Sequence, residues 1–218
     1  MSIPSFLLLY YFPTQVTALH LAAGFSSASI VKVILETCLD IDVRDEDGRI
    51  PLHYASRHNN VDVVSLLVES GADLKAVNRG KWTRLHFAAQ NKSVDVVKMV
   101  LTYSAADVDA CDDDETTPLH FAAQHSGVDV VKLLISRGAN VGAVNKNQRT
   151  LLHFAAKNKD VDVVKMIINT SGADVKAVDK DKQTPLHTAA KLNPNADVIR
   201  ALVEGGALVD ARADYFGY

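Results

Sequence analysis

Two cysteines, Cys38 and Cys111, are too few to hold a chain of 218 residues together by disulfides, which excludes a small secreted disulfide scaffold. A strong charge of either sign is also missing, because 23 basic and 26 acidic residues leave a net charge of −3. This balance excludes a chain that is basic throughout and neutralises phosphates. No stretch approaches the roughly 20 apolar residues that span a bilayer, so we expect no membrane insertion.

Motifs for catalysis and cofactor binding are absent as well. The sequence has no C-x-x-C pair, no G-x-x-x-x-G-K-[ST] or G-x-G-x-x-G loop for phosphates, and no G-x-S-x-G motif. The acidic residues after Cys111 would raise the pKa of its thiol rather than activate it. We therefore expect no enzyme and no bound cofactor, since no residues combine a nucleophile, a base and an orienting partner.

What the sequence does contain is a period of 33 or 34 residues. The period is marked by histidines within phrases such as T-P-L-H-F-A-A, namely His20, His53, His86, His120, His153 and His187. A phrase close to V-V-K-L-L-I follows each histidine, and one close to S-G-A-D-V-K-A closes most units. This pattern resembles the ankyrin repeat, whose signature is T-P-L-H-x-A at a period of 33. The resemblance implies an all-α solenoid of helix-turn-helix units with projecting β-hairpin or loop tips.

The resemblance covers residues 14–214, between an apolar N-terminal segment (1–13) and a tail (215–218). We divide it into six repeats: 14–46, 47–79, 80–113, 114–146, 147–180 and 181–214. A single unit cannot bury its apolar faces alone, whereas stacked units can. The period therefore replaces the one or two globular domains that the length suggests with a stack of repeats.

Residues at fixed positions of the repeat predict its helices. A threonine stands at the N-cap position of the first helix in five units, and proline comes directly after the N-cap position in three units, at Pro51, Pro118 and Pro185. An alanine recurs at one position of that helix, where a small side chain lets neighbouring helices approach. In the second helix, Val94, Val97 and Leu101 recur at i, i+3 and i+7 and predict an apolar face. Glycines then mark the end of this helix in four units, at Gly71, Gly138, Gly172 and Gly206.

Two departures from this pattern bear on local structure. Ile50 replaces the capping threonine of one unit, which should weaken that cap by ~1 kcal/mol. In the turn between the two helices, where the family usually has glycine, five units have Ser26, Asn59, Lys92, Ser126 and Lys159. Because residues other than glycine are strained at positive φ, these turns either have another conformation or are slightly strained.

The regular histidines suggest a metal site, but their spacing excludes one. Helices pack roughly 8–10 Å apart, whereas the ligands of one zinc lie ~2 Å from the ion. We expect each motif histidine to bond to the threonine before it and to nearby backbone instead.

Residues 6–12 form a short apolar run that has three interpretations. It resembles the core of a signal peptide, but no basic residue precedes it. As the outer helix of a preceding repeat it would be out of register. We favour a cap on the first repeat or a disrupted upstream repeat, and hence a cytoplasmic protein, secreted only if residues 1–13 act as a targeting segment. The last repeat has the apolar pattern of an internal one, as expected either for a segment of a longer array or for a short protein whose last unit is imperfectly capped.

In ankyrin proteins the partner usually contacts the tips and the first-helix positions after the double alanine. The resemblance therefore implies a protein partner, of unknown identity, bound by a monomer through its concave face and tips. Tip charges alternate in sign and form no continuous basic stripe, so we expect no nucleic acid to bind. The candidate contact residues are Arg79, Lys81, Trp82, Gln90, Asn91, Asp113, Asp114, Gln124, His125, Lys146, Arg149, Lys157 and Asn158.

Two alternatives remain open at individual residues, and two at the level of function. Trp82 fits either an interface anchor or packing on the adjacent tip. The acidic run 112–115 fits a solvated tip better than a docking site for a basic peptide. The resemblance also admits an ankyrin region of a larger channel, toxin or membrane-associated protein, or a substrate-recruiting adaptor or effector.

Overall fold

The computed structural model describes residues 15–58, 60–103 and 107–214. Within these ranges it contains twelve helices and, apart from isolated bridges, no β-structure. The predicted N-terminal segment (1–13) and tail (215–218) lie outside the described residues, as does Asn59 of the turns discussed above.

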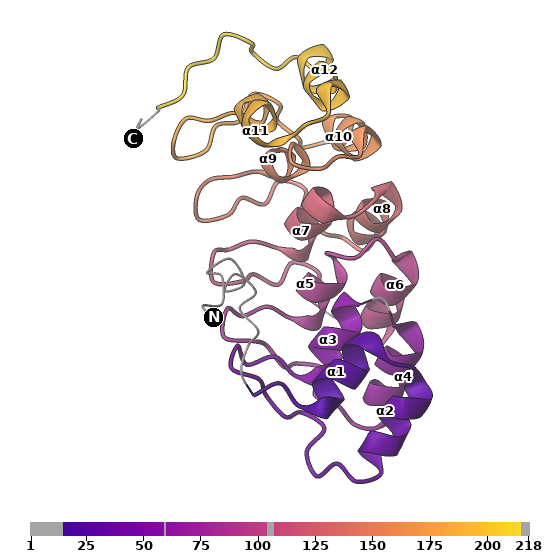
Figure 1. Ribbon diagram of the computed structural model, residues 1–218. Coiled ribbons are helices and arrows are strands. Elements are labelled where there is room, and N and C mark those ends of the chain that lie inside the picture. Colours follow the sequence, from indigo (N-terminus) through magenta and orange to yellow (C-terminus); the bar gives the residue numbers. More distant parts are fainter. Residues whose placement is uncertain (1–14, 59, 104–106, 215–218) are drawn as a thin grey trace, which may run out of the picture.

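The helices form an inner row beside the projecting loops and an outer row behind it (Figure 1). The inner helices are α1 (Ala18–Phe25), α3 (Pro51–Arg57), α5 (Arg84–Ala88), α7 (Pro118–His125), α9 (Leu151–Ala155) and α11 (Pro185–Leu192). The outer helices are α2 (Ala28–Leu35), α4 (Val61–Glu69), α6 (Val94–Thr102), α8 (Val128–Ser136), α10 (Val161–Ile168) and α12 (Ala196–Glu204). Within each row every helix packs on the next one, so the helices form a continuous column. The all-α solenoid that the sequence predicts is confirmed.

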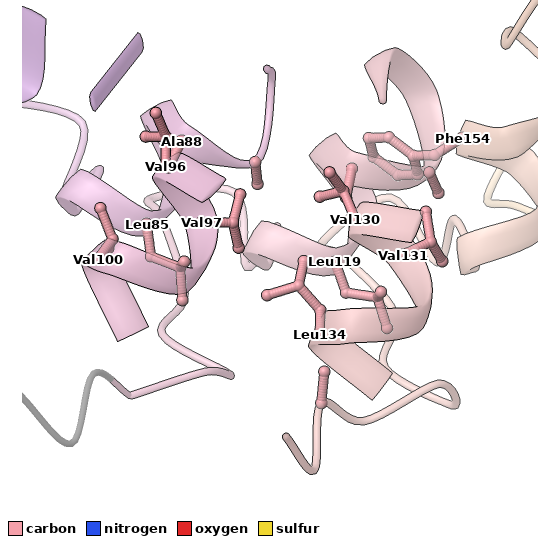
Figure 2. Packing of buried hydrophobic residues seen from close by; sticks show 14 of the residues in the cluster. Leu85, Ala88, Val96, Val97, Val100, Leu119, Val130, Val131, Leu134 and Phe154 are labelled. Carbon is pink, nitrogen blue, oxygen red and sulfur yellow. The ribbon is translucent and has the colours of Figure 1, made fainter. Parts of the chain in front are cut away.

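One apolar core runs along the column between the two rows. The recurrent alanine is buried in every inner helix, at Ala22, Ala55, Ala88, Ala122, Ala155 and Ala189. Figure 2 shows side chains of α6 and α8 gathered against α5 and α7. These contacts explain why the helices stack closely: a larger side chain at the alanine position would have no room.

The buried line of the outer helices differs from the predicted one. In α6 the fully buried residues are Val96, Val97 and Val100, whereas Val94 and Leu101 are only half-buried. An outer helix packs on its own inner helix and on an outer helix at either side. Its most buried line therefore points at the inner row, and the flanks of its apolar face lie against its neighbours.

The motif histidine connects each inner helix to the loop that follows it. Its Nδ1 accepts the backbone N–H of the N-cap residue at 3.1–3.2 Å in all six inner helices. In five of them Nε2 lies 2.9–3.2 Å from a backbone carbonyl oxygen of the following loop, such as that of Arg49 or Thr116. Since a carbonyl can only accept, Nε2 carries the proton and the ring is neutral. The predicted role of these histidines is confirmed.

Burial and this bonding pattern set the charge state of the histidines. Desolvation lowers the pKa of His53 and His120 to about 4, and lowers that of His20, His86 and His153 as well. The loop carbonyls that accept from Nε2 oppose this shift without cancelling it. These five rings therefore stay neutral near pH 7.

The threonine hydroxyl adds a second contact to the histidine at five N-caps. It lies 2.9–3.0 Å from Nδ1, as between Thr117 and His120. Ile50 has no hydroxyl, although its backbone N–H still bonds to His53 Nδ1 at 3.1 Å. The weaker cap expected there stays a prediction.

Four glycines end their outer helices in the left-handed conformation that the sequence predicts. Their φ angles lie between 92° and 98°, at Gly71, Gly138, Gly172 and Gly206. After Gly71, Gly138 and Gly206 the next N–H turns back to a carbonyl of the helix at 3.0–3.1 Å, for example from Ala72 to Leu67, and satisfies one of its orphan carbonyls. The N–H after Gly172 bonds instead to Thr170, beyond the end of α10.

The inter-helix turns have another conformation rather than a strained one. Ser26 and Ser126 are extended, with φ of −115° and −99°, and neither Lys92 nor Lys159 has a positive φ. Polar side chains near these turns bond to the preceding helix pair. For example, Ser126 Oγ donates to the Ala89 carbonyl at 2.7 Å. These side chains link consecutive pairs, which a glycine turn alone would not do.

The tips contain the left-handed residues instead. Positive φ angles of 55–67° occur at five equivalent positions, Gln15, Lys81, Glu115, Gln148 and Lys182, and the same position in the remaining unit is Gly48 with φ of 74°. Single bridges, Val77 with Thr83 and Val144 with Thr150, are the β-pairs among the described residues. The tips are therefore mainly loops rather than regular β-hairpins.

An Asp or Asn at the base of each tip closes the loop. Its Oδ1 accepts the N–H groups two and four residues further on, at Asp45, Asn78, Asp112, Asn145 and Asp179. Neighbouring tips are joined by backbone bonds, such as that from the Lys146 N–H to the Asp114 carbonyl at 2.8 Å. Tips and helices thus stack in the same register.

Acid should destabilise the fold before carboxylates titrate. Below pH 6.5 the unfolded chain binds protons that the buried rings do not, so the free energy of unfolding falls as pH decreases towards 4. At about pH 5.5 we expect a loss of ~1 kcal/mol from each of His53 and His120. Urea titrations followed by circular dichroism would measure this. An unchanged urea midpoint between about pH 7.5 and 5.5 would contradict the assigned neutral state.

Replacing Gln148 by glycine should stabilise the protein. Gln148 is exposed and left-handed, a conformation that costs a non-glycine residue about 1–2 kcal/mol. After subtracting the entropy of glycine, we expect Gln148→Gly to raise the free energy of unfolding by roughly 0.5 kcal/mol. The matched control is Asn147→Gly at the preceding position, where φ is not positive. A gain for the control that equals the gain for Gln148→Gly would refute the explanation.

Candidate functional site

The predicted contact residues lie on the inner face, which we define as the tips and the exposed side of the inner helices. Those on the tips are Arg79, Lys81, Trp82, Asp113, Asp114, Lys146 and Arg149. Those at or just after the C-terminal ends of the inner helices are Gln90, Asn91, Gln124, His125, Lys157 and Asn158. We use the term helix-end strip for these residues, for Arg57, His58 and Lys191 at the equivalent positions of α3 and α11, and for the turns that follow.

The charges of neighbouring tips pair with each other. Lys81 Nζ lies 3.0 Å from Asp113 Oδ1 on the next tip, and Lys182 Nζ lies 2.8 Å from Asp214 Oδ2. Arg149 Nε lies 3.0 Å from Oδ2 of the buried Asp179. The alternation of sign along the sequence therefore brings opposite charges together between stacked tips. Exposed pairs of this kind contribute ~0–1 kcal/mol each.

Trp82 is half-buried among rings from two inner helices. Its ring centroid lies 4.4 Å from that of Phe121 and 5.4 Å from that of Phe87. The side chain therefore bridges the tip before α5 to α5 and α7. These contacts explain the tryptophan by packing, and its half-exposed remainder still faces the inner face.

An aromatic ladder forms the floor of the inner face. The residue after the motif histidine is aromatic in four units, at Tyr54, Phe87, Phe121 and Phe154. Each ring lies 4.8–5.9 Å, centroid to centroid, from the motif histidine of the preceding helix pair. Sequence reasoning missed this ladder, although the L-H-[FY]-A phrase carries its signal.

The predicted helix-end residues divide into structural and exposed ones. Asn158 is 6 % exposed, and its Nδ2 donates to the carbonyls of Ala123 and Ser126 at 2.9 and 2.8 Å. The half-buried Asn91 donates to the Arg57 carbonyl at 3.0 Å. Both amides therefore join successive helix pairs. Because Asn158 is also almost fully buried, its side chain is not available to a partner.

Three of the more exposed side chains of the strip, Gln124, His125 and Lys157, lie around a hollow of about 280 Å³ at the ends of α7 and α9. The hollow is lined by Lys92, Gln124, His125, Ser126, Gly127, Lys157, Asn158, Lys159 and Asp160. Lys157 Nζ lies 3.5 Å from Gln124 Oε1 and 5.2 Å from the centroid of the Phe154 ring. The predicted set omitted Lys92 and Lys159, because only stacking of three successive pairs brings these turn residues to one place.

A smaller hollow of about 30 Å³ lies at α3 and α5. It is lined by Arg49, His53, Tyr54, Arg57, His58 and Phe87. Arg49 belongs to a tip and Arg57 to the helix-end strip, so this hollow connects the two parts of the inner face. The guanidinium carbon of Arg49 lies 5.3 Å from the centroid of the Tyr54 ring.

The cysteines show no sign of activation. Both are free thiols, and Cys111 is exposed. Burial and then the charges of nearby acidic residues, Glu115 first, raise the pKa of Cys111. The expected direction of this shift is confirmed, and a raised pKa disfavours a nucleophilic thiolate.

The comparison with known families agrees with the helix pairs. The model described as ankyrin repeats (3 copies) matches residues 6–78, 73–145 and 129–214. No curated protein matches the chain. In the part of the chain that the structure describes, every helix is too short or too polar to cross a membrane.

Truncating Trp82 should reveal its packing role. We expect Trp82→Ala to lower the free energy of unfolding by roughly 2 kcal/mol, because it removes a half-buried ring from contact with Phe87 and Phe121. Arg79→Ala, at an exposed position of the same tip, should change it by less than about 0.5 kcal/mol. Denaturant titrations would compare the two variants, and equal losses would contradict the packing account.

Proposed function

The chain belongs to the ankyrin-repeat family, and on this basis we propose that it is a protein-binding module. Ankyrin repeats generally serve protein–protein interaction. We place the partner on the inner face, the concave face of the family, where it meets the tips and the helix-end strip. The proposed activity is binding by a monomer, without a catalytic step.

The observation that supports this proposal most is the way in which the exposed side chains are held. Gln124 and His125 extend from a helix whose histidine, alanine and turn residues are all buried in contacts with neighbouring pairs. Side chains on such a framework are already positioned before a partner arrives. Binding then costs little ordering entropy, which favours specific affinity at modest contact area.

Free thiols support a reducing compartment for this module. Cys38 and Cys111 are both unpaired by disulfides, as is usual for proteins of the cytoplasm. We therefore propose that the partner is met in the cytoplasm.

Affinity capture with matched surface variants tests the proposal. The inner-face variant is Gln90→Ala/Gln124→Ala/His125→Ala, which removes exposed or half-exposed polar groups without touching the core. The control is Lys98→Ala/Lys132→Ala/Ser136→Ala on outer helices α6 and α8. We expect proteins captured by the unmodified chain to fall at least tenfold, a loss of about 1.4 kcal/mol or more, with the inner-face variant only. Loss with the outer-face control and retention with the inner-face variant would place binding elsewhere.

A further inference from the structure

The helix-end strip has an uncompensated positive charge, in contrast to the tips. The inner helices, within the bounds given above, contain no Asp or Glu. The larger hollow is lined by Lys92, Lys157 and Lys159 against a single acid, Asp160. The Asp160 carboxylate already accepts the Asp162 N–H at 3.0 Å, where it caps α10.

The smaller hollow continues this character along the column. Its lining includes Arg57 and His58 and no acidic side chain. Its third basic residue, Arg49, is already paired with Asp45 and Asp47, at 2.8 and 2.9 Å. His125 connects the two hollows electrostatically. Burial lowers its pKa, and so do the positive charges of Lys157 in the larger hollow and Arg57 in the smaller one. Lys191, exposed at the position of α11 that corresponds to Lys157, extends the surface towards the last pair.

We propose that the strip binds an extended acidic segment of a partner protein, with a carboxylate about every third residue, running across α3 to α11. The proposal rests on the proposed function and names the chemistry of its partner. The charge of the strip is complementary to such a segment: the lysines of the larger hollow outnumber its one acid, Asp160, and together with Arg57 they attract carboxylates and orient the segment.

The spacing of the inner helices also fits an extended segment. Successive inner helices pack on each other, and packed helices lie about 8–10 Å apart. A polyproline II segment advances about 9 Å in three residues and returns the same face with each turn. A carboxylate at every third position of such a segment therefore meets one helix pair after another in register.

The structure favours a protein segment over a nucleic acid. Bases bind basic grooves largely by stacking on open aromatic faces. Here Phe87 and Phe154 are buried, and each packs against the motif histidine of the preceding pair. The half-buried Tyr54 and Phe121 pack in the same way, and the exposed Phe25 lies on α1, outside the proposed site across α3 to α11. The groups that this part of the strip leaves free are thus mainly cations and amides.

Binding of synthetic peptides to the full chain tests this proposal by fluorescence anisotropy. The probe is a labelled peptide of five Glu-Pro-Pro repeats, compared with a peptide of the same composition in which the glutamates are contiguous. We expect the repeating peptide to bind at least tenfold more tightly than the contiguous one, and its affinity to fall with salt. A Lys-Pro-Pro peptide should not bind.

Matched variants place the peptide on the strip. Lys157→Gln/Lys191→Gln should weaken binding at least tenfold, whereas Lys98→Gln/Lys132→Gln, the same charge change on outer helices, should leave it within about twofold. Lys92→Gln/Lys159→Gln, at exposed turn positions that line the hollow, gives a second test should the first variant unfold.

Several outcomes would overturn the proposal. Equal losses in the strip and outer-face variants would mean non-specific attraction, and equal affinity for the contiguous peptide would refute the spacing. A single-stranded oligonucleotide that binds the strip more tightly than the peptide would make it a nucleic-acid site. If no peptide binds but partner capture still depends on the inner face, the acidic segment is wrong and the proposed function stands.

Discussion

A buried neutral imidazole is the contact on which this column depends. In each inner helix the ring accepts the N-cap N–H through Nδ1, and in five it donates through Nε2 to the loop that leads to the next pair. One side chain therefore starts a helix and fixes the loop beside it. Both bonds require the neutral ring with its proton on Nε2. The lowered pKa of rings such as His53 is therefore linked to the stability of the fold.

Further contacts turn this local arrangement into a stiff surface. Turn residues such as Ser126 and Asn158 bond to the preceding pair, and backbone bonds join neighbouring tips. Each pair is thus bonded to its neighbour at the tip and at the inter-helix turn, and it packs against that neighbour along its helices. The inner face that results is long, regular and positioned in advance, which is what a binding surface made of many small contacts requires.

Charge is distributed differently over the two parts of that face. On the tips, opposite charges lie on successive loops and meet when the loops stack, as Lys81 and Asp113 do. On the helix-end strip, three lysines from two pairs converge around one acid, Asp160. The net charge of −3 describes neither part, because the tips largely cancel and the strip remains basic.

The sequence by itself determined the period, the two helices of each pair, the role of the motif histidine and the glycines that end the outer helices. The helices, their glycine ends and the histidine bond to its N-cap depend on residues a few positions apart, and the repetition of these local signals gives the period. The Nε2 bond of the histidine, to a carbonyl 23–30 residues away, joins these local elements to the following loop. Tertiary structure alone decided the conformation of the inter-helix turns, the burial of Asn158 and the position of Lys92 and Lys159 at one hollow. Each of these depends on contact with a pair one or two repeats away in the chain, which no local pattern records.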